Sequence, residues 1–261
     1  MNRRHQMQPP AANNEAGQPD PNGWQPSAQR PNFATNSHHI ARWNAELRSK
    51  SPLEITRWAI SQADGRALVS TNFRPYEAVV LHLCSQVQPD IPVLWVDHGY
   101  NRSATYKHAE QLKRLLGLNL KAYLPKITPS HRDAVYGPIP GPEDEAALKQ
   151  FSALMKLEPF QRGMRELAPK TWITALRKVQ NPNRAELDIV SHDANFGTLK
   201  VSPVFNSTDA DMEAYLAQHG LLNEWDYFDP AKADDKRECG LHAAWGAKAV
   251  ASQLEIAGTG I

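Results

Sequence analysis

The sequence has little cysteine, no long apolar run and no excess of either charge. Only 2 of its 261 residues are cysteine, too few for a disulfide framework and too few for the four thiolates of an iron–sulfur cluster. No apolar stretch approaches the ~20 residues that span a bilayer. The formal net charge of +1 gives no overall attraction to nucleic acid or to an anionic membrane. These absences favour a soluble protein of the reducing cytoplasm, with neither nucleic acid nor membrane as a partner.

Metal-binding patterns are missing as well. The histidines show no H-x-x-x-H or H-x-H spacing, and neither Cys84 nor Cys239 has a second cysteine three residues away. Structural zinc sites and iron–sulfur clusters depend on such closely spaced ligands. We therefore predict a protein with no metal and no bound cofactor. The oligomeric state does not follow from these absences, and a homodimer is compatible with them.

The chain begins with a compositionally biased stretch and changes character near residue 38. Residues 1–37 are rich in Pro, Asn, Gln and Gly and poor in large aliphatic side chains. Such a stretch buries too little apolar surface to offset the entropy of ordering. We predict a disordered segment at 1–37, an α/β domain at 38–230, and a C-terminal segment at 231–261 that carries Cys239.

Strand-like and helix-like runs alternate through the central part of the chain. The run "IPVLWVD" is almost wholly apolar, which is typical of a central parallel strand covered on both faces. The runs "PYEAVVLHLCSQV" and "SATYKHAEQLKRLLG" have helical spacing, and the second ends at a glycine. Four other runs are read as strands: "RALVST", "NLKAYLP", "KTWITALR" and "TLKVSPVF". The alternation predicts a doubly wound, mostly parallel α/β sheet with its ligand at the carboxyl ends of the strands.

Polar and cationic residues follow the predicted strands. The run "STNFRPYEA" leads from Ser70 into a helix N-terminus, where backbone N–H groups and the helix dipole favour an anion. "DHGY" places Asp97 and Gly99 at a sharp turn, and Arg177 and Arg184 follow another strand. Lys200 lies on the predicted strand "TLKVSPVF", and Lys156 and Arg162 flank "LEPF". Taken singly, each arginine also reads as a solvated surface residue and Asp97 as a turn cap, but together they predict a ligand with several phosphate-like groups.

The two cysteines lie in different surroundings. Cys84 falls on an apolar helix face and is interpreted as an inert core residue. Cys239 lies in a polar segment, with Lys236 and Arg237 before it and His242 after it. Nearby cations favour the thiolate and so raise nucleophilicity at neutral pH. Cys239 is therefore a candidate nucleophile, the alternative being an incidental surface cysteine.

Several segments, in this order and spacing, resemble the phosphoadenylyl sulfate reductase family, the thioredoxin-dependent enzymes of sulfate assimilation. The resemblance covers roughly residues 65–242. The segments that carry it are "AVVLHLCSQVQPDIPVLWVDHGY", "KLEPFQR", "TWITALRKVQNPNRAE", "LKVSPV" and "RECGLH". The last is the most specific, because in that family it holds the catalytic cysteine.

The resemblance implies a domain of the adenine nucleotide alpha-hydrolase type and a reductive reaction on 3′-phosphoadenylyl sulfate. The Cys239 thiolate would attack sulfur, release adenosine 3′,5′-bisphosphate and become S-sulfocysteine, from which reduced thioredoxin or glutaredoxin would free sulfite. The groups implied to hold the phosphates and the sulfate are Lys156, Arg177, Arg184, Arg237 and His242. The nucleotide would lie against the loop from Ser70 to Glu77, including Asn72, Phe73 and Arg74, with Asp97, Gly99 and Tyr100.

The chain departs from the family's pattern at the loop after the first strand. The family has S-F-G followed by a small residue, whereas this chain has Asn72, Phe73, Arg74 and Pro75. The Cys-Cys pair of the branch that carries an iron–sulfur cluster and reduces adenylyl sulfate is missing, so the resemblance favours the cluster-free branch. The alternatives are reduction of adenylyl sulfate, a nucleotide-binding relative without reductase chemistry, and a fold relative that activates its substrate by adenylation.

Overall fold

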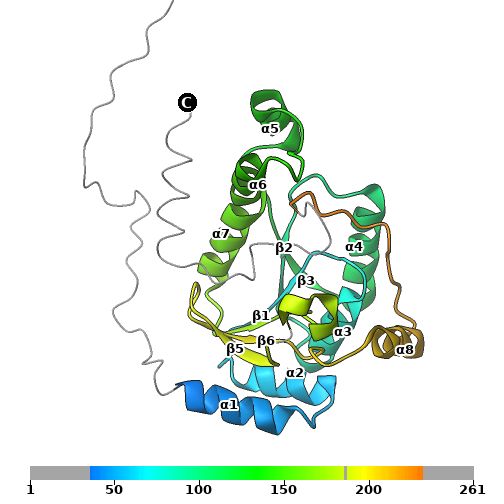
Figure 1. Cartoon of the computed structure of the whole chain (residues 1–261). Helices are drawn as coiled ribbons and strands as arrows, with labels where there is room; N and C mark the ends of the chain where they lie inside the picture. Colours follow the sequence, from blue (N-terminus) through cyan, green and yellow to red (C-terminus); the bar gives the residue numbers. More distant parts are fainter. Residues whose placement is uncertain (1–35, 185–186, 232–261) are drawn as a thin grey trace, which may run out of the picture.

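The computed structural model describes residues 36–184 and 187–231, which build one six-stranded sheet with helices around it (Figure 1). The strands are β1 (Ala67–Thr71), β2 (Pro92–Val96), β3 (Asn119–Tyr123), β4 (Thr171–Ile173), β5 (Val190–Asp193) and β6 (Thr198–Val201). Their order in the sheet is β3-β2-β1-β4-β6-β5. Every pairing is parallel except that of β5 with β6. The predicted mostly parallel α/β class is confirmed.

The strand order reverses between β1 and β4. From β1 the chain builds outward through β2 to β3, then returns to the other side of β1 to place β4 and β6. Loops leave neighbouring strands in opposite directions at such a point, so a crevice forms at the carboxyl ends of the strands. The sheet therefore positions a ligand site beside Thr71 and Ile173, the last residues of β1 and β4.

The two runs predicted to be helical form α3 and α4, and the structure contains further helices in the described residues. The helices are α1 (Asn36–Leu47), α2 (Pro52–Ser61), α3 (Glu77–Val87), α4 (Ser103–Leu116), α5 (Pro129–Tyr136), α6 (Glu145–Ser152), α7 (Glu158–Leu167) and α8 (Asp209–His219), with a π-helical turn at Ala153–Leu157. Ser51 caps α2 in a capping box with Glu54. Gly117 ends α4 in the left-handed conformation that glycine adopts readily.

The two faces of the sheet bury separate apolar clusters. Val69, Val93 and Ile173 face a large core together with side chains of α2, α3 and α4. Their strand neighbours Leu68, Leu94 and Trp172 point to the other face, where Phe160 and Met164 of α7 cover them. This alternation follows from the two-residue period of a strand. Helices on both faces make the sheet doubly wound, as predicted.

Cys84 lies in the larger core and is fully buried. Burial disfavours the thiolate and raises the pKa of its thiol far above the ordinary value. The interpretation of Cys84 as an inert core residue is confirmed.

The structure bears only in part on the predicted boundaries of the chain. Helix α1 begins at Asn36, and the rest of the predicted segment 1–37, like nearly all of 231–261, lies outside the described residues. Over the ranges 36–184 and 187–231, no helix is long and apolar enough to cross a membrane. Strand β5 was not predicted, because "VSHD" is short and mostly polar; it forms through an antiparallel pairing with β6.

Candidate functional site

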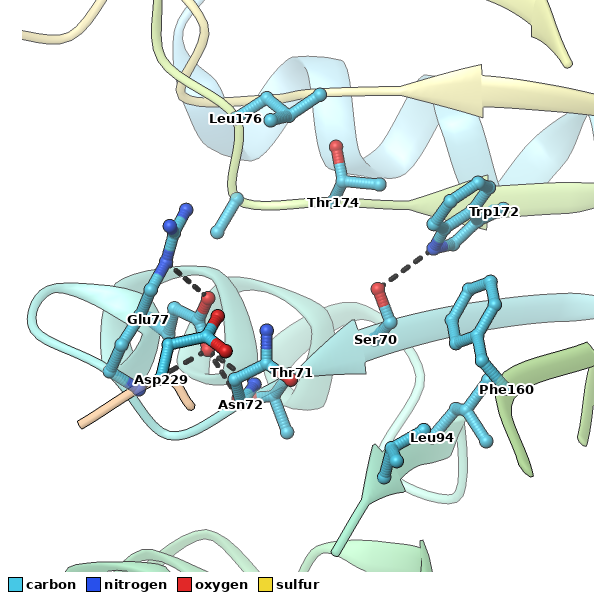
Figure 2. Close-up of a pocket in the computed structure, with 13 residues that line it drawn as sticks. Ser70, Thr71, Asn72, Glu77, Leu94, Phe160, Trp172, Thr174, Leu176 and Asp229 are labelled. Carbon is cyan, nitrogen blue, oxygen red and sulfur yellow. Dashed lines mark hydrogen bonds and ion pairs between the residues drawn. The ribbon is translucent and has the colours of Figure 1, made fainter. Parts of the chain in front are cut away.

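A pocket opens at the carboxyl ends of β1 and β4, where the strand order reverses (Figure 2). Its lining consists of Ser70, Thr71, Asn72, Arg74, Glu77, Leu94, Val96, Phe160, Trp172, Thr174, Ala175, Leu176 and Asp229. In Figure 2 the rings of Phe160 and Trp172 stand at one end and the carboxylates of Glu77 and Asp229 at the other. The pocket thus has an apolar end and a charged end.

Glu77, the first residue of α3, closes the loop that follows β1. One of its carboxylate oxygens accepts hydrogen bonds from the Thr71 hydroxyl at 2.8 Å and from the backbone N–H of Asn72 at 2.7 Å. The same oxygen accepts the backbone N–H of Arg74 at 3.4 Å, and the other accepts Arg74 Nε at 2.8 Å. Only 8% of the Glu77 side chain is exposed. The predicted anion-binding amides do face an anion, but that anion belongs to the protein.

The same loop holds two residues other than glycine in the left-handed region. Phe73 has φ of 55° and Tyr76 has φ of 70°, a conformation that costs about 1 kcal/mol or more per residue. Contacts offset this cost. The Phe73 ring packs edge-on against Trp95 at 5.1 Å between centroids, and the Tyr76 N–H donates to Asn223 at 2.8 Å. Arg74, which occupies the position of the family's glycine, has a negative φ, so its side chain fits without backbone strain.

Removing the charge of Glu77 is expected to weaken the loop. In Glu77→Gln, one carboxylate oxygen becomes an NH₂ group, which cannot accept a hydrogen bond. If the amide oxygen still accepts from the Thr71 hydroxyl and the two backbone N–H groups, the NH₂ group faces Arg74 Nε, and two donors oppose each other. We expect the free energy of unfolding to fall by about 1–3 kcal/mol, the scale of one unsatisfied buried polar group. Urea denaturation measures it. Glu110→Gln on α4, whose side chain is 55% exposed, is the matched control, and an equal loss in both variants would contradict the role of Glu77 in holding the loop.

Lys156 lies in the π-helical turn and is paired with Asp229. Its Nζ atom is 2.6 Å and 2.7 Å from the two carboxylate oxygens, and the two side chains are 3% and 5% exposed. Burial alone would raise the pKa of Asp229, but the Lys156 ammonium more than reverses this, so the pKa lies below its ordinary value. The Asp229 carboxylate lines the pocket, whereas Lys156 is not among the lining residues.

His98 lies close enough to this pair for their charges to act on it. Burial and, secondarily, the Lys156 charge lower the pKa of His98 to about 4. At neutral pH the imidazole is therefore uncharged and adds no second cation beside Asp229. Lys156 and Asp229 consequently balance each other with one charge of each sign.

The two arginines that follow β4 are buried, so their interpretation as solvated surface residues is wrong. Arg177 is 3% exposed, pairs with Asp209 at 2.7 Å and lies over the Tyr76 ring at 5.0 Å. Its Nε atom is buried and has no hydrogen-bond partner among the described residues. Arg184 is 4% exposed and donates to Gln180. Both guanidiniums lie outside the described lining of the pocket.

The turn after β2 is built as predicted. The Asp97 carboxylate accepts the Gly99 N–H at 3.0 Å and the Tyr106 hydroxyl at 2.8 Å, so Asp97 caps the turn. Gly99 has φ of 76°, and a Cβ atom there would lie 2.5 Å from a ring carbon of Pro129. Tyr100 donates its hydroxyl to Asp133 at 2.5 Å. The turn stands beside the pocket but is not part of its described lining.

The structure brings some predicted site residues together and leaves others apart. Ser70, Asn72 and Arg74 line the pocket, and Phe73 packs in the core beneath the loop. Lys156 reaches the pocket only through Asp229. Three predicted residues lie outside the described part of the chain: Cys239, Arg237 and His242. Thr71 and Glu77 also line the pocket and belong to the loop from Ser70 to Glu77 that was predicted to hold the nucleotide. The lining residues that sequence reasoning did not select are Leu94, Val96, Phe160, Trp172, Thr174, Ala175, Leu176 and Asp229.

Comparison with known proteins gives a consistent picture. Residues 66–224 match the model of the phosphoadenosine phosphosulfate reductase domain. The chain is 32% identical over 222 residues to a phosphoadenosine 5′-phosphosulfate reductase of a Synechococcus species, covering 76% of this chain and 95% of that one. It is 35% identical over 225 residues to the protein of that name from Vibrio campbellii, covering 78% and 86%. The crystal structure of a phosphoadenylyl-sulfate reductase from Candida auris superposes with a TM-score of 0.61 at 22% identity, covering 71% of this chain and 88% of the other.

Proposed function

Because the chain belongs to the phosphoadenosine phosphosulfate reductase family, we propose that it reduces 3′-phosphoadenylyl sulfate to sulfite and adenosine 3′,5′-bisphosphate. The observation that carries the proposal is the match to relatives of this activity over nearly their whole length. The pocket supports it. A crevice at the strand-order reversal is where doubly wound sheets bind nucleotides. Its apolar end, with Phe160 and Trp172, suits a nucleoside.

The proposed nucleophile is Cys239. Its thiolate attacks the sulfur atom, the bond between sulfur and the bridging phosphate oxygen breaks, and adenosine 3′,5′-bisphosphate leaves with the electron pair. A thiol of a reduced dithiol protein then attacks the sulfur of Cys239 and expels sulfite, and its second thiol resolves the mixed disulfide. The two electrons thus come from the dithiol, which leaves as a disulfide. Thioredoxin or glutaredoxin is the proposed donor, with no iron–sulfur cluster, in the cytoplasm.

The cations are proposed to stabilise the charge that develops on the leaving phosphate. Fixed donors in a site shielded from water are effective because they need no reorganisation during the reaction. Arg237 and His242 flank Cys239 in the sequence and would favour its thiolate. The other proposed contacts with anionic groups are Lys156, Arg177 and Arg184, while the loop from Ser70 to Arg74 and the turn at Asp97, Gly99 and Tyr100 are proposed to hold the nucleotide. The Nε atom of Arg177, which is buried and has no hydrogen-bond partner in the described part of the chain, supports its inclusion.

One observation favours a second candidate, reduction of adenylyl sulfate. Among the described residues that line the pocket, two are carboxylates, Glu77 and Asp229, and one is a cation, Arg74. Such a balance opposes each additional negative charge on a ligand, and adenylyl sulfate lacks the 3′-phosphate. The match to relatives still favours the 3′-phosphorylated nucleotide.

Wild-type turnover separates these possibilities. We expect sulfite when the full chain is incubated with reduced thioredoxin and 3′-phosphoadenylyl sulfate, at a larger kcat/KM than with adenylyl sulfate. Sulfite formed from adenylyl sulfate but not from 3′-phosphoadenylyl sulfate would establish the second candidate, reduction of adenylyl sulfate. Binding of adenosine 3′,5′-bisphosphate with no sulfite from either nucleotide would show a binding protein that lacks the reductase chemistry.

A further inference from the structure

The pocket proposed to bind a polyanion presents a carboxylate where a cation is needed. Asp229 lines the pocket at its charged end (Figure 2), and the ammonium of Lys156 is bound to both of its oxygens. We propose that Asp229 is an exchangeable counter-ion: it pairs with Lys156 in the absence of substrate and is displaced when an anionic group of the substrate takes its place. The inference rests on the proposed function and adds a residue that sets substrate affinity.

The geometry makes Asp229 a stand-in for the ligand. The two contacts of 2.6 Å and 2.7 Å from Nζ are those that two oxygens of a phosphate or sulfate could make with the same ammonium. The carboxylate lies on the pocket side of the pair, because Asp229 is among the lining residues and Lys156 is not. An anion entering from the pocket therefore meets Asp229 before it can reach Lys156.

Because the pair is buried, replacement of Asp229 by another anion is more favourable than movement of Asp229 away from Lys156 with nothing in its place. Side-chain exposures of 3% and 5% mean that water compensates neither charge well, and a buried ion left without its partner is strongly unfavourable. An incoming anion avoids this cost for Lys156, since one negative group replaces another. The displaced carboxylate then gains water at the pocket mouth. His98 is the neighbouring titratable group and is neutral at pH 7, so it cannot take over the role of counter-ion for either partner.

The two partners differ in how firmly the backbone holds them. Lys156 lies in a π-helical turn continuous with α6 and α7, and its neighbour Met155 is fully buried. Asp229 lies in the irregular stretch 221–231, which has no helix or strand. The described contacts of this stretch outside its own residues include the bonds from the Tyr76 N–H to Asn223 and from Arg102 to Asp226. The Asp229 carboxylate also accepts the Ala231 N–H at 3.1 Å. Displacing Asp229 therefore breaks this bond but no helix or strand, whereas the backbone of Lys156 is held in a helix.

A permanent structural pair would have a smaller effect on binding. If Asp229 stayed on Lys156 with substrate bound, the polyanion would face the carboxylates of both Glu77 and Asp229, with Arg74 as the cation in the described lining. Neutralising Asp229 would then relieve some repulsion but also remove an orienting partner of Lys156, so the two effects would offset each other and the affinity would change little. Under exchange, neutralising Asp229 removes a direct competitor for the Lys156 ammonium, and the affinity for an anionic nucleotide rises strongly. The size of the change distinguishes the two roles.

The test is calorimetric titration of the full chain with adenosine 3′,5′-bisphosphate. In Asp229→Asn, the amide oxygen can still accept from Lys156, but it competes less well than a carboxylate. We expect the Kd to fall by about tenfold, the scale of one charge-assisted hydrogen bond. The matched control is Asp226→Asn in the same stretch, because Asp226 is 50% exposed, pairs with Arg102 and lies outside the described lining. Its Kd should change by less than about twofold.

Thermal denaturation supplies a second readout. Asp229→Asn should melt at a lower temperature than wild type without nucleotide, and nucleotide should raise its melting temperature by more than it raises that of wild type. If the asparagine variant does not fold, Asp229→Ser, which admits water to Lys156, is measured in the same way. Tighter binding confined to the Asp229 variants supports the exchange. Unchanged or weaker binding there, with wild type binding normally, overturns the exchange alone, and no binding by wild type overturns the proposed function together with it.

Discussion

Replacing Cys239 with serine is expected to lower the rate of sulfite release by roughly a thousandfold or more, the scale on which enzymes lose turnover without their nucleophile. A serine hydroxyl is not ionised near neutral pH and attacks sulfur poorly, so no S-sulfocysteine can form. Nucleotide affinity should stay nearly unchanged, because the cysteine supplies chemistry rather than anionic contacts. The measurement is thioredoxin-coupled sulfite production, with calorimetry of adenosine 3′,5′-bisphosphate binding on the same preparation.

Cys84→Ser is the matched control for this variant. Cys84 is fully buried in the core between α3 and the sheet and is not among the described lining residues of the pocket. We expect it to retain turnover and to lose about 1–3 kcal/mol of stability, because a hydroxyl replaces a thiol in apolar surroundings. Wild-type turnover in Cys239→Ser would contradict the proposed mechanism, and loss of turnover in Cys84→Ser alone would move the nucleophile to the other cysteine.

Replacing Lys156 with methionine is expected to have the largest effect on stability. The substitution leaves the Asp229 carboxylate buried and unpaired, which costs about 3–5 kcal/mol when one partner of a buried ion pair is removed. Urea denaturation at pH 7 measures the loss. Lys149→Met is the matched control on α6, because Lys149 and its partner Glu145 are 60% and 62% exposed; its stability should change by less than about 0.5 kcal/mol.

The loss caused by Lys156→Met should depend on pH in a defined direction. In wild type the pKa of Asp229 is lowered in the folded state, so its pairing stabilises the fold above the unfolded pKa of about 3.9 and less as pH falls through the folded value. Without Lys156, burial raises the folded pKa instead, and protonation relieves the unpaired charge. The difference from wild type should therefore shrink as pH falls from 7 toward 4. A constant difference would show that Asp229 is not the group left unpaired. The double variant Lys156→Met, Asp229→Leu should recover much of the loss.

Local patterns predicted most of the fold because the features that define it are local. The apolar run of β2 and the Gly117 stop of α4 each lie within a few residues, and both are confirmed. Strand β5 was not predicted because its burial does not alternate from residue to residue and because it forms through its pairing with β6. Patterns within one run cannot report pairing that depends on a second strand.

The site was predictable in its location but not in its charge balance. The loop after β1 was expected to bind an anion, and Glu77, only three residues beyond Arg74, could have been recognised as a carboxylate placed to accept the loop's N–H groups. The pairing of Asp229 with Lys156 could not, because 73 residues separate the two and Asp229 lies in a stretch without periodic pattern. The burial of Arg177 likewise depends on Asp209 of α8 and the Tyr76 ring.

The π-helical turn between α6 and α7 joins them into one continuous helix whose two halves pack into different apolar clusters. Before the turn, Phe151 packs with Met155 and Ala231; after it, Phe160 and Met164 pack with Trp172 on the sheet. A π-turn contains one residue more than a regular α-helical path, and one residue corresponds to a rotation of about 100° around the axis. Figure 1 shows α6 and α7 following one another along a common direction.

Lys156 lies inside the π-helical turn. The direction in which its side chain points therefore depends on the number of residues between α6 and α7 as well as on their identity. A one-residue deletion between Phe151 and Phe160 would give a regular helix but would turn one of the two apolar stripes, or Lys156 itself, away from its partner. During evolution, the stretch from Phe151 to Phe160 should therefore tolerate substitutions more readily than insertions or deletions.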